Sequence, residues 1–193
     1  MPDPSTRDAI VAAADRLFYE TGYDATSFAD IAGAVGLSRG NFYYHFRSKD
    51  EILAAVIEHR LAATAGMLDG WEKTAETPRA RIAAFIDMMT ANSALIMRHG
   101  CPVGTLTTEL AKLRHGSRNE ASRLFILFRT WLARQFSALG RPDDADRLAL
   151  HLLLMSQGIA TLSAAFGEET IIRDEVAALH VWLDGIASAQ MPA

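Results

Sequence analysis

The 193-residue sequence has little of what marks a secreted, membrane-bound or disulfide-stabilised protein. Its single cysteine, Cys101, excludes an intramolecular disulfide and is typical of a reducing compartment. The first residues contain neither the basic nor the apolar stretch of a secretory signal. The longest apolar run, from Leu148 to Met155, is interrupted by His151 and is too short to span a bilayer. We therefore expect a cytoplasmic protein with no membrane partner.

Patterns that carry catalysis or cofactor binding are also missing. The sequence has no HExxH, no cysteine pair for zinc, no glycine-rich phosphate loop and no GxSxG. Its six histidines are scattered, and none pairs with a second ligand at helical metal spacing. We expect no catalytic site, no metal site and no cofactor. Half of the residues are apolar, which supplies a substantial core and excludes a disordered chain.

The distribution of charge is more informative than its sum. A net charge of −4 counts mildly against nucleic-acid binding. Between Ile31 and Lys49, however, there are three cations and no acid. A small basic face on an acidic protein can bind DNA locally while the remaining surface keeps the protein soluble.

Helical spacing of apolar residues runs through the chain, and sustained period-two alternation is absent, which predicts an all-α fold. Capping residues, glycines and prolines set the helix limits. The expected helices are 6–20, 27–35, 38–46, 49–68, 78–99, 102–115, 117–139, 143–166 and 170–189.

The two short helices at 27–35 and 38–46, joined by Gly36-Leu37, have the pattern of a helix-turn-helix. Phe42 and Phe46 lie four residues apart and would form the buried side of the second helix. The polar and basic residues between them stay available to a partner. An aromatic hinge between two helical domains would explain the aromatic residues but not these polar ones.

Each exposed side chain has a use at a DNA surface. Arg39 can donate two hydrogen bonds to guanine, and Asn41 can pair with adenine in the same way. Gly40 costs about 1 kcal/mol inside a helix, which makes sense where the backbone must approach a partner closely. Tyr43 and Tyr44 can contact phosphates or thymine methyls. His45 and Lys49 are placed for phosphate contacts.

The segments Thr26–Ala32 and Gly36–Leu53 closely resemble the DNA-binding domain of TetR-family transcriptional regulators. The resemblance covers about a quarter of the chain, and the remainder matches in length and helical pattern only. It implies a three-helix DNA-binding domain at residues 1–48 and a larger helical domain for ligand binding and dimerisation at 49–193. It also implies a homodimeric repressor that a small molecule releases from a double-stranded DNA operator. The DNA contacts it implies, taken together with the N-cap Ser38, are Ser27, Ser38, Arg39, Gly40, Asn41, Tyr43, Tyr44, His45 and Lys49.

One position departs from the pattern of some members, which place a base-contacting cation where Ala29 stands here. Ala29 can make only apolar contacts, so base recognition rests on Arg39 and Asn41.

The last two helices carry apolar residues at alternating spacings of four and three. Such seams form either a helix pair within one core or a four-helix interface across a two-fold axis. Because one helix-turn-helix contacts only a half-site, we favour the dimer. The predicted interface residues are Leu152, Met155, Ile159, Leu162, Val176, Leu179, Leu183 and Ile186.

The middle helices combine methionines and aromatics with a few polar groups, which suits a cavity for a largely apolar effector. For any single one of these residues, core packing is the better explanation. The candidates are Phe85, Met89, Asn92, Cys101, Glu109, Phe128 and Trp131, with Gln157 as a further polar position.

Cys101 lies between Gly100 and Pro102 at a helix start, next to Arg98 and His99, which favours a reactive thiol. A redox or electrophile sensor and a small buried residue both fit this segment. For the whole chain, two other functional classes stay open: a helical enzyme or carrier, and a protein-interaction adaptor that docks through the aromatic segment.

Overall fold

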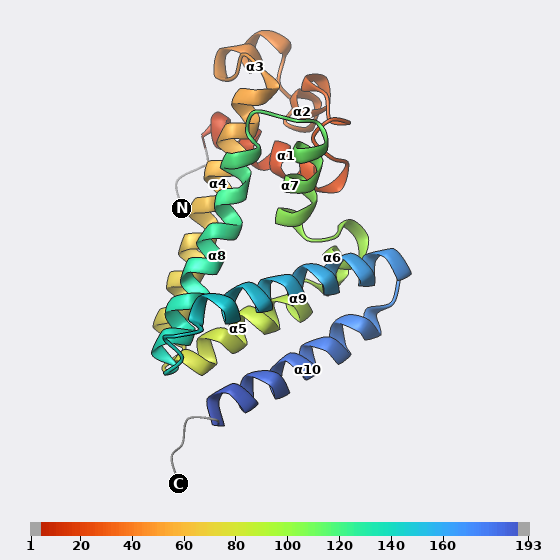
Figure 1. Cartoon of the computed structure of the whole chain (residues 1–193). Coiled ribbons are helices and arrows are strands. Elements are labelled where there is room, and N and C mark those ends of the chain that lie inside the picture. The colour runs from red at the N-terminus through yellow and green to blue at the C-terminus, as the bar shows by residue number, and fades with distance from the viewer. Residues whose placement is uncertain (1–4, 189–193) are drawn as a thin grey trace. The chain divides into compact units, whose positions relative to one another are not determined.

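The computed structural model describes residues 5–188, and over that range the chain forms ten α-helices and no strand (Figure 1). The all-α prediction is therefore confirmed. The helices are α1 Thr6–Glu20, α2 Phe28–Ala34, α3 Arg39–His45, α4 Lys49–Thr74, α5 Pro78–Ala91, α6 Ser93–His99, α7 Pro102–Lys112, α8 Arg118–Ala138, α9 Ala145–Phe166 and α10 Glu169–Ser188.

The chain divides into two compact units whose limits cut across the sequence. The first unit comprises the chain through Thr64 together with Pro102–Leu124, and the second comprises Ala65–Cys101 and the chain from Phe125 onward. Helices α4 and α8 therefore each contribute to both units. A functional boundary after residue 48 stays a prediction, because compactness does not define where DNA binding ends.

The core of the first unit gathers apolar side chains from α1, α2, α3, α4 and α7. Ile10 and Phe18 of α1 belong to the same buried cluster as Phe42 and Phe46. Arg60 of α4 is also buried, and its charge is paired: Nε lies 2.5 Å from Asp15 Oδ1. Its Nη1 donates to the Pro102 carbonyl at 2.6 Å, which ties the start of α7 to this unit.

The second unit is a layered bundle in which α10 packs against α5 and α9, and α9 packs against α6 (Figure 1). At 22 residues, α9 is long and apolar enough to cross a membrane by length and composition. Its Leu152 and Ile159 are buried within the unit, as expected for the core helix of a globular bundle.

Three predicted helices have different limits in the structure, and the predicted end of the last one, Ala189, lies outside the described residues. The helix expected at 102–115 ends at Lys112. The helix expected at 78–99 is broken into α5 and α6 at Asn92, whose backbone leaves the helical conformation (φ −108°, ψ 13°). The Asn92 side-chain amide donates to the Met88 carbonyl at 2.8 Å at this break. The helix expected to end near Leu68 continues to Thr74, through Gly70.

Candidate nucleic-acid interface

The start of α2 is fixed by a reciprocal capping box. The Ser27 hydroxyl accepts the Asp30 backbone N–H at 3.1 Å, and the Asp30 carboxylate accepts the Ser27 N–H at 2.8 Å. These hydrogen bonds hold the pKa of the Asp30 carboxyl below its ordinary value. The cap orients Ser27, which is exposed at the end of the helix.

The turn between α2 and α3 requires a glycine. Gly36 has φ +65°, a conformation that side-chain-bearing residues rarely adopt. The next backbone N–H, from Leu37, donates to the Ala32 carbonyl at 3.1 Å. Leu37 then packs against the core, so the turn holds the two short helices together.

The two sides of α3 differ sharply in exposure. Phe42 and Phe46 are each only 1% exposed, which confirms the predicted buried side. Tyr44 is 87% exposed, and Tyr43 is exposed while its ring stacks on Phe28 with centroids 5.1 Å apart. This stacking gives Tyr43 a defined direction on the surface.

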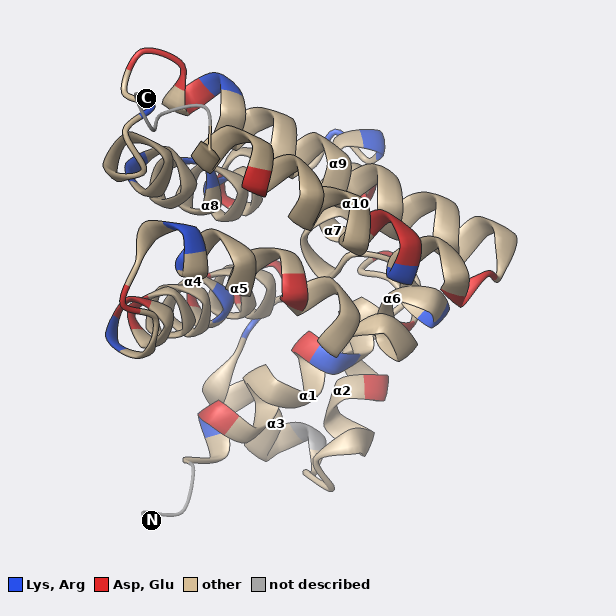
Figure 2. Cartoon of the chain, turned by 90° about the horizontal axis from the view of Figure 1, so that it is seen from below, with Lys and Arg blue, Asp and Glu red and all other residues tan. Residues whose placement is uncertain are grey.

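The remainder of the outward side of α3 is open and carries no acid. Gly40 and Asn41 are exposed, and a Cβ built on Gly40 meets nothing within 4 Å. Acidic residues are absent from α3 and reappear in the first turn of α4, at Asp50 and Glu51 (Figure 2). A helix-turn-helix whose second helix is exposed, acid-free and rich in hydrogen-bonding groups is the arrangement that fits a DNA groove.

Comparisons with known proteins agree with this geometry. Residues 10–56 match the family model described as bacterial regulatory proteins, tetR family. A regulator of Lactococcus lactis subsp. lactis, described as an uncharacterized HTH-type transcriptional regulator in the lacX 3' region, is 33% identical over 137 residues, 70% of each chain. This chain belongs to the TetR family.

Two further similarities extend the result. The crystal structure of a TetR transcriptional regulator from Legionella pneumophila has a TM-score of 0.82 and 25% identity, over 96% of this chain and 98% of that one. The HTH-type transcriptional repressor DhaR of a Mycobacterium species is 27% identical over 124 residues, 62% of this chain and 59% of its own. The protein is therefore a TetR-family transcriptional regulator, and members of this family bind DNA and typically act as dimers.

Lys49 occupies an unexpected position in this TetR-family chain. Its ammonium group donates to the carbonyls of Tyr23, Thr26 and Asp24 at 2.9, 3.1 and 3.3 Å. The same nitrogen lies 4.4 Å from the centroid of the Tyr23 ring. An ammonium group has three protons, so these carbonyls satisfy all of its donors. In the free protein Lys49 thus holds the turn between α1 and α2.

Glu109, predicted to face an effector, contacts this same turn. One carboxylate oxygen accepts the Tyr23 backbone N–H at 2.9 Å, and the other accepts the Asp24 N–H at 2.8 Å. Gly22 has φ +96°, and a Cβ there would lie 3.1 Å from the carboxylate. The turn is therefore held from α7 by Glu109 and from α4 by Lys49.

A third group of contacts joins Tyr23 to the start of α4 and to the α7–α8 connection. The Tyr23 hydroxyl donates to Asp50 Oδ1 at 2.6 Å, which lowers the pKa of the Asp50 carboxyl. Burial and the same carboxylate raise the pKa of Tyr23. Nδ1 of His115 accepts the Ser117 N–H, so the ring proton lies on Nε2, 3.2 Å from the Tyr23 oxygen. Sequence patterns gave no signal for this network.

Of the residues predicted to bind an effector, four are buried in the second unit: Phe85, Met89, Phe128 and Trp131. The rings of Phe85 and Phe128 meet edge to face at 5.5 Å. Trp131 donates its indole N–H to Glu72 at 2.7 Å. Their role toward an effector stays a prediction.

The polar candidates of the second unit lie in separate places. Asn92 is exposed at the break between α5 and α6. Cys101 is half-buried, and the Gln157 side-chain amide donates toward its Sγ at 3.4 Å.

Most of the residues predicted to form the dimer interface are buried in the core of the single chain. Leu183 is fully buried, Met155 is half-buried and Leu162 is 49% exposed. The other predicted interface residues, all buried, are Leu152, Ile159, Val176, Leu179 and Ile186. The four–three spacing of these positions therefore serves the packing of α9 and α10 within one chain.

The same two helices carry other apolar residues on their outward sides. These are large side chains that the chain's own helices leave exposed: Leu150, Leu154, Leu162 and Phe166 on α9, and Val181 on α10. Small residues flank Val181, at Ala177, Ala178 and Gly185, and would let a second helix approach closely.

Proposed function

We propose that this TetR-family regulator is a cytoplasmic homodimeric repressor that binds a palindromic operator and leaves it when a small, largely apolar molecule binds the second unit. The observation that carries the proposal is the exposed, acid-free side of α3. It bears Asn41, Tyr43 and Tyr44 above the two buried phenylalanines. The family and its named repressor relative support the same function.

For DNA contact, we propose that Arg39 and Asn41 pair with base edges in the major groove. The tyrosines, His45 and the capped Ser27 contact the sugar–phosphate backbone and fix the register. Ser38, which caps α3 by accepting the Asn41 N–H at 3.5 Å, and Gly40 let the helix start lie close to the duplex. We infer that Lys49 acts on this surface indirectly: it donates a hydrogen bond to the Thr26 carbonyl and so orders the turn that precedes Ser27.

For dimerisation, we propose that the outward sides of α9 and α10 meet their copies across a two-fold axis. Exposed Leu154, Phe166 and Val181 are large enough to form an apolar interface once covered. Two recognition helices would then contact half-sites about 34–36 Å apart, which requires a palindromic operator.

For the effector, we propose that the aromatic and methionine side chains around Phe85 and Phe128 rearrange to admit an apolar molecule. Cys101 and Gln157 lie in contact in the same unit, so a covalent change at the thiol would alter this contact. Operator release by oxidants or electrophiles that persists in Cys101→Ser would remove Cys101 from the mechanism.

A salt titration against duplex DNA tests the function. Sequences retained by the protein from a random duplex pool should share a palindrome. The logarithm of the affinity for that duplex should fall linearly with the logarithm of the salt concentration. Absence of binding at low salt, or binding that does not vary with salt, would contradict a DNA-binding role and favour a carrier or an adaptor.

A further inference from the structure

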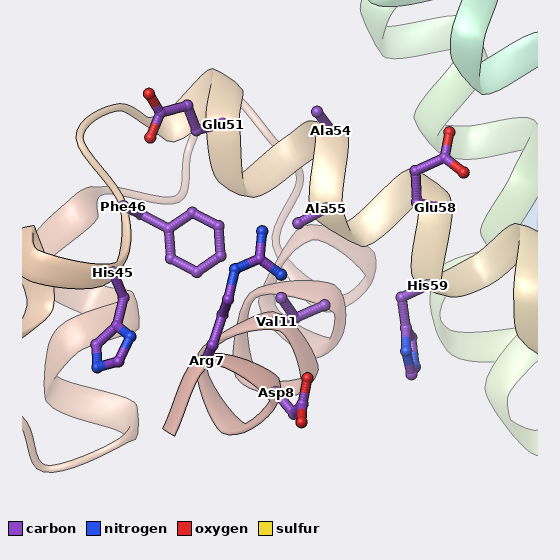
Figure 3. Close-up of a pocket in the computed structure, with 10 residues that line it drawn as sticks. All are labelled: Arg7, Asp8, Val11, His45, Phe46, Glu51, Ala54, Ala55, Glu58 and His59. Carbon is purple, nitrogen blue, oxygen red and sulfur yellow. The ribbon is translucent and has the colours of Figure 1, made fainter. Parts of the chain in front are cut away.

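A pocket of about 600 Å³ lies in the first unit beside the end of α3 (Figure 3). Its walls come from the first turns of α1, the last residues of α3 and the first half of α4. Three basic side chains line it: Arg7 of α1, His45, the final residue of α3, and His59 of α4. The pocket is thus next to the helix proposed to enter the DNA groove.

Arg7 is held in this pocket by an aromatic ring. Its guanidinium carbon lies 4.7 Å from the centroid of Phe46, the residue that follows α3 as its C-cap and is 1% exposed (Figure 3). A guanidinium group on an aromatic face keeps its N–H groups available at its edge. Arg7 itself is exposed, so these donors reach solvent.

The acids around the pocket form their hydrogen bonds and ion pairs with other residues. The pKa of Asp8 is lowered mainly by its hydrogen bond from Ser5 and less by the charge of Arg7. Asp8 accepts hydrogen bonds from Ser5, and Glu51 accepts the Arg47 backbone N–H at 2.8 Å. Glu58 pairs with Arg123 at 2.6 Å. Between residues 5 and 188, no carboxylate forms an ion pair with Arg7 in the structure. Arg7 is therefore a positioned cation whose hydrogen-bonding edge is still available.

We propose that Arg7 is a further DNA contact, outside the helix-turn-helix, and that its guanidinium binds a backbone phosphate of the duplex beside the end of α3. This proposal rests on the proposed DNA-binding function. The planar guanidinium matches two phosphate oxygens, and the Phe46 ring fixes the direction in which it points. His45 lines the same pocket and supplies a second donor. The phosphate-binding surface then includes α1, and Phe46 links Arg7 to the recognition helix.

The test compares the full-length wild type with Arg7→Ala, Arg7→Met and the control Arg16→Ala. Arg16 lies on the same helix, is exposed and pairs with Glu20 at 3.5 Å. Affinity is measured for the protein-selected duplex and for a random-sequence duplex over a range of salt. Loss of one phosphate contact should lower the salt slope by about 0.9, so the wild-type advantage over the variant shrinks about 3.5-fold between about 50 and 200 mM salt.

The expected loss is equal on both duplexes, because a phosphate contact carries no base preference. Arg7→Met keeps an apolar side chain over Phe46 without the charge. If Arg7→Ala melts at a lower temperature, the DNA affinity of Arg7→Met shows whether the loss comes from the missing charge or from a less stable fold. Wild-type slopes in Arg7→Met would overturn the Arg7 site while leaving the proposed function intact. Failure of the wild type to bind either duplex would instead overturn the proposed function. Reduced slopes in Arg16→Ala would show a general charge effect and would also overturn the site.

Discussion

Glu109 binds the backbone N–H of Tyr23 at 2.9 Å across 86 residues of sequence. Its second oxygen binds the Asp24 N–H, so one side chain of α7 satisfies two donors of the turn that precedes α2. Hydrogen bonds to a charged acceptor contribute more than neutral ones, and losing the acceptor leaves both N–H groups to compete for water.

We predict that Glu109→Ala lowers the free energy of unfolding by on the order of 2 kcal/mol. The loss comes from the two N–H groups and from a loosened turn, so urea denaturation is the measurement. Thr108→Ala, at an exposed neighbouring position on α7, is the control and should behave like the wild type. Equal stability of Glu109→Ala and wild type would show that water replaces the carboxylate without cost.

Lys49→Ala should reduce both stability and DNA affinity while leaving the salt slope unchanged. Its three protons are donated to the carbonyls of Tyr23, Asp24 and Thr26, so the alanine variant loses turn order and no phosphate contact. Denaturation and a salt titration on the same preparation measure the two effects. A slope reduced by about 0.9 would instead assign Lys49 to a phosphate.

Tyr23→Phe should change how stability depends on pH. The Tyr23 hydroxyl lowers the pKa of Asp50, so the ionised carboxylate stabilises the folded state above its unfolded pKa of about 3.9, and this contribution disappears as the pH falls through the lower folded value. The stability difference between wild type and variant should therefore be constant near neutrality and narrow below about pH 4. Urea denaturation at neutral and acidic pH measures it, and a difference independent of pH would contradict the assignment.

Arg39→Ala should relax base preference at one operator position. A bidentate pair with guanine contributes about 1–3 kcal/mol of discrimination, so affinity should fall on the selected duplex and change little on a random one. Binding to single-substitution operator variants identifies the position. Equal losses on specific and random DNA would assign Arg39 to the backbone.

Val181 and Leu183 offer a matched pair on α10. Val181 is 74% exposed, whereas Leu183 is fully buried. Val181→Glu should dissociate the proposed dimer while helix content is retained, because it places a charge only on the outward side. Leu183→Glu should cost on the order of 4 kcal/mol of stability by burying a charge. Sedimentation and circular dichroism distinguish them, and a dimeric Val181→Glu would move the interface elsewhere.

The parts of the structure that sequence predicted are those set by local rules. The Ser27–Asp30 cap, the Gly36 turn and the buried spacing of Phe42 and Phe46 all lie within a few residues of one another. The positions of the helices and most of their limits followed from the same local patterns of caps, turns and apolar spacing. Asn92 was one exception, because the helix breaks there although its apolar spacing continues.

What sequence could not predict depends on distant partners. Nothing near Glu109 indicates that its oxygens meet the N–H groups of a turn far upstream. The apolar spacing in α9 and α10 predicts that each helix has a buried side. It does not indicate whether Leu152 or Leu183 is buried by its own chain or by a second copy. No sequence pattern pointed to Arg7 either, because its aromatic partner, Phe46, lies far along the chain, just after α3.

The two-segment make-up of the first unit limits how new regulators can be engineered from this one. A chimera that exchanges only the N-terminal 48 residues would separate Tyr23 from Glu109 and Asp15 from Arg60. A functional graft would also have to include residues 49–64 and 102–124, or the recipient would have to supply an arginine and an acid at matching positions. The fold of the first unit therefore depends on two separate stretches of sequence, and successful grafts should be those that carry the first half of α4 and α7 along with α1, α2 and α3.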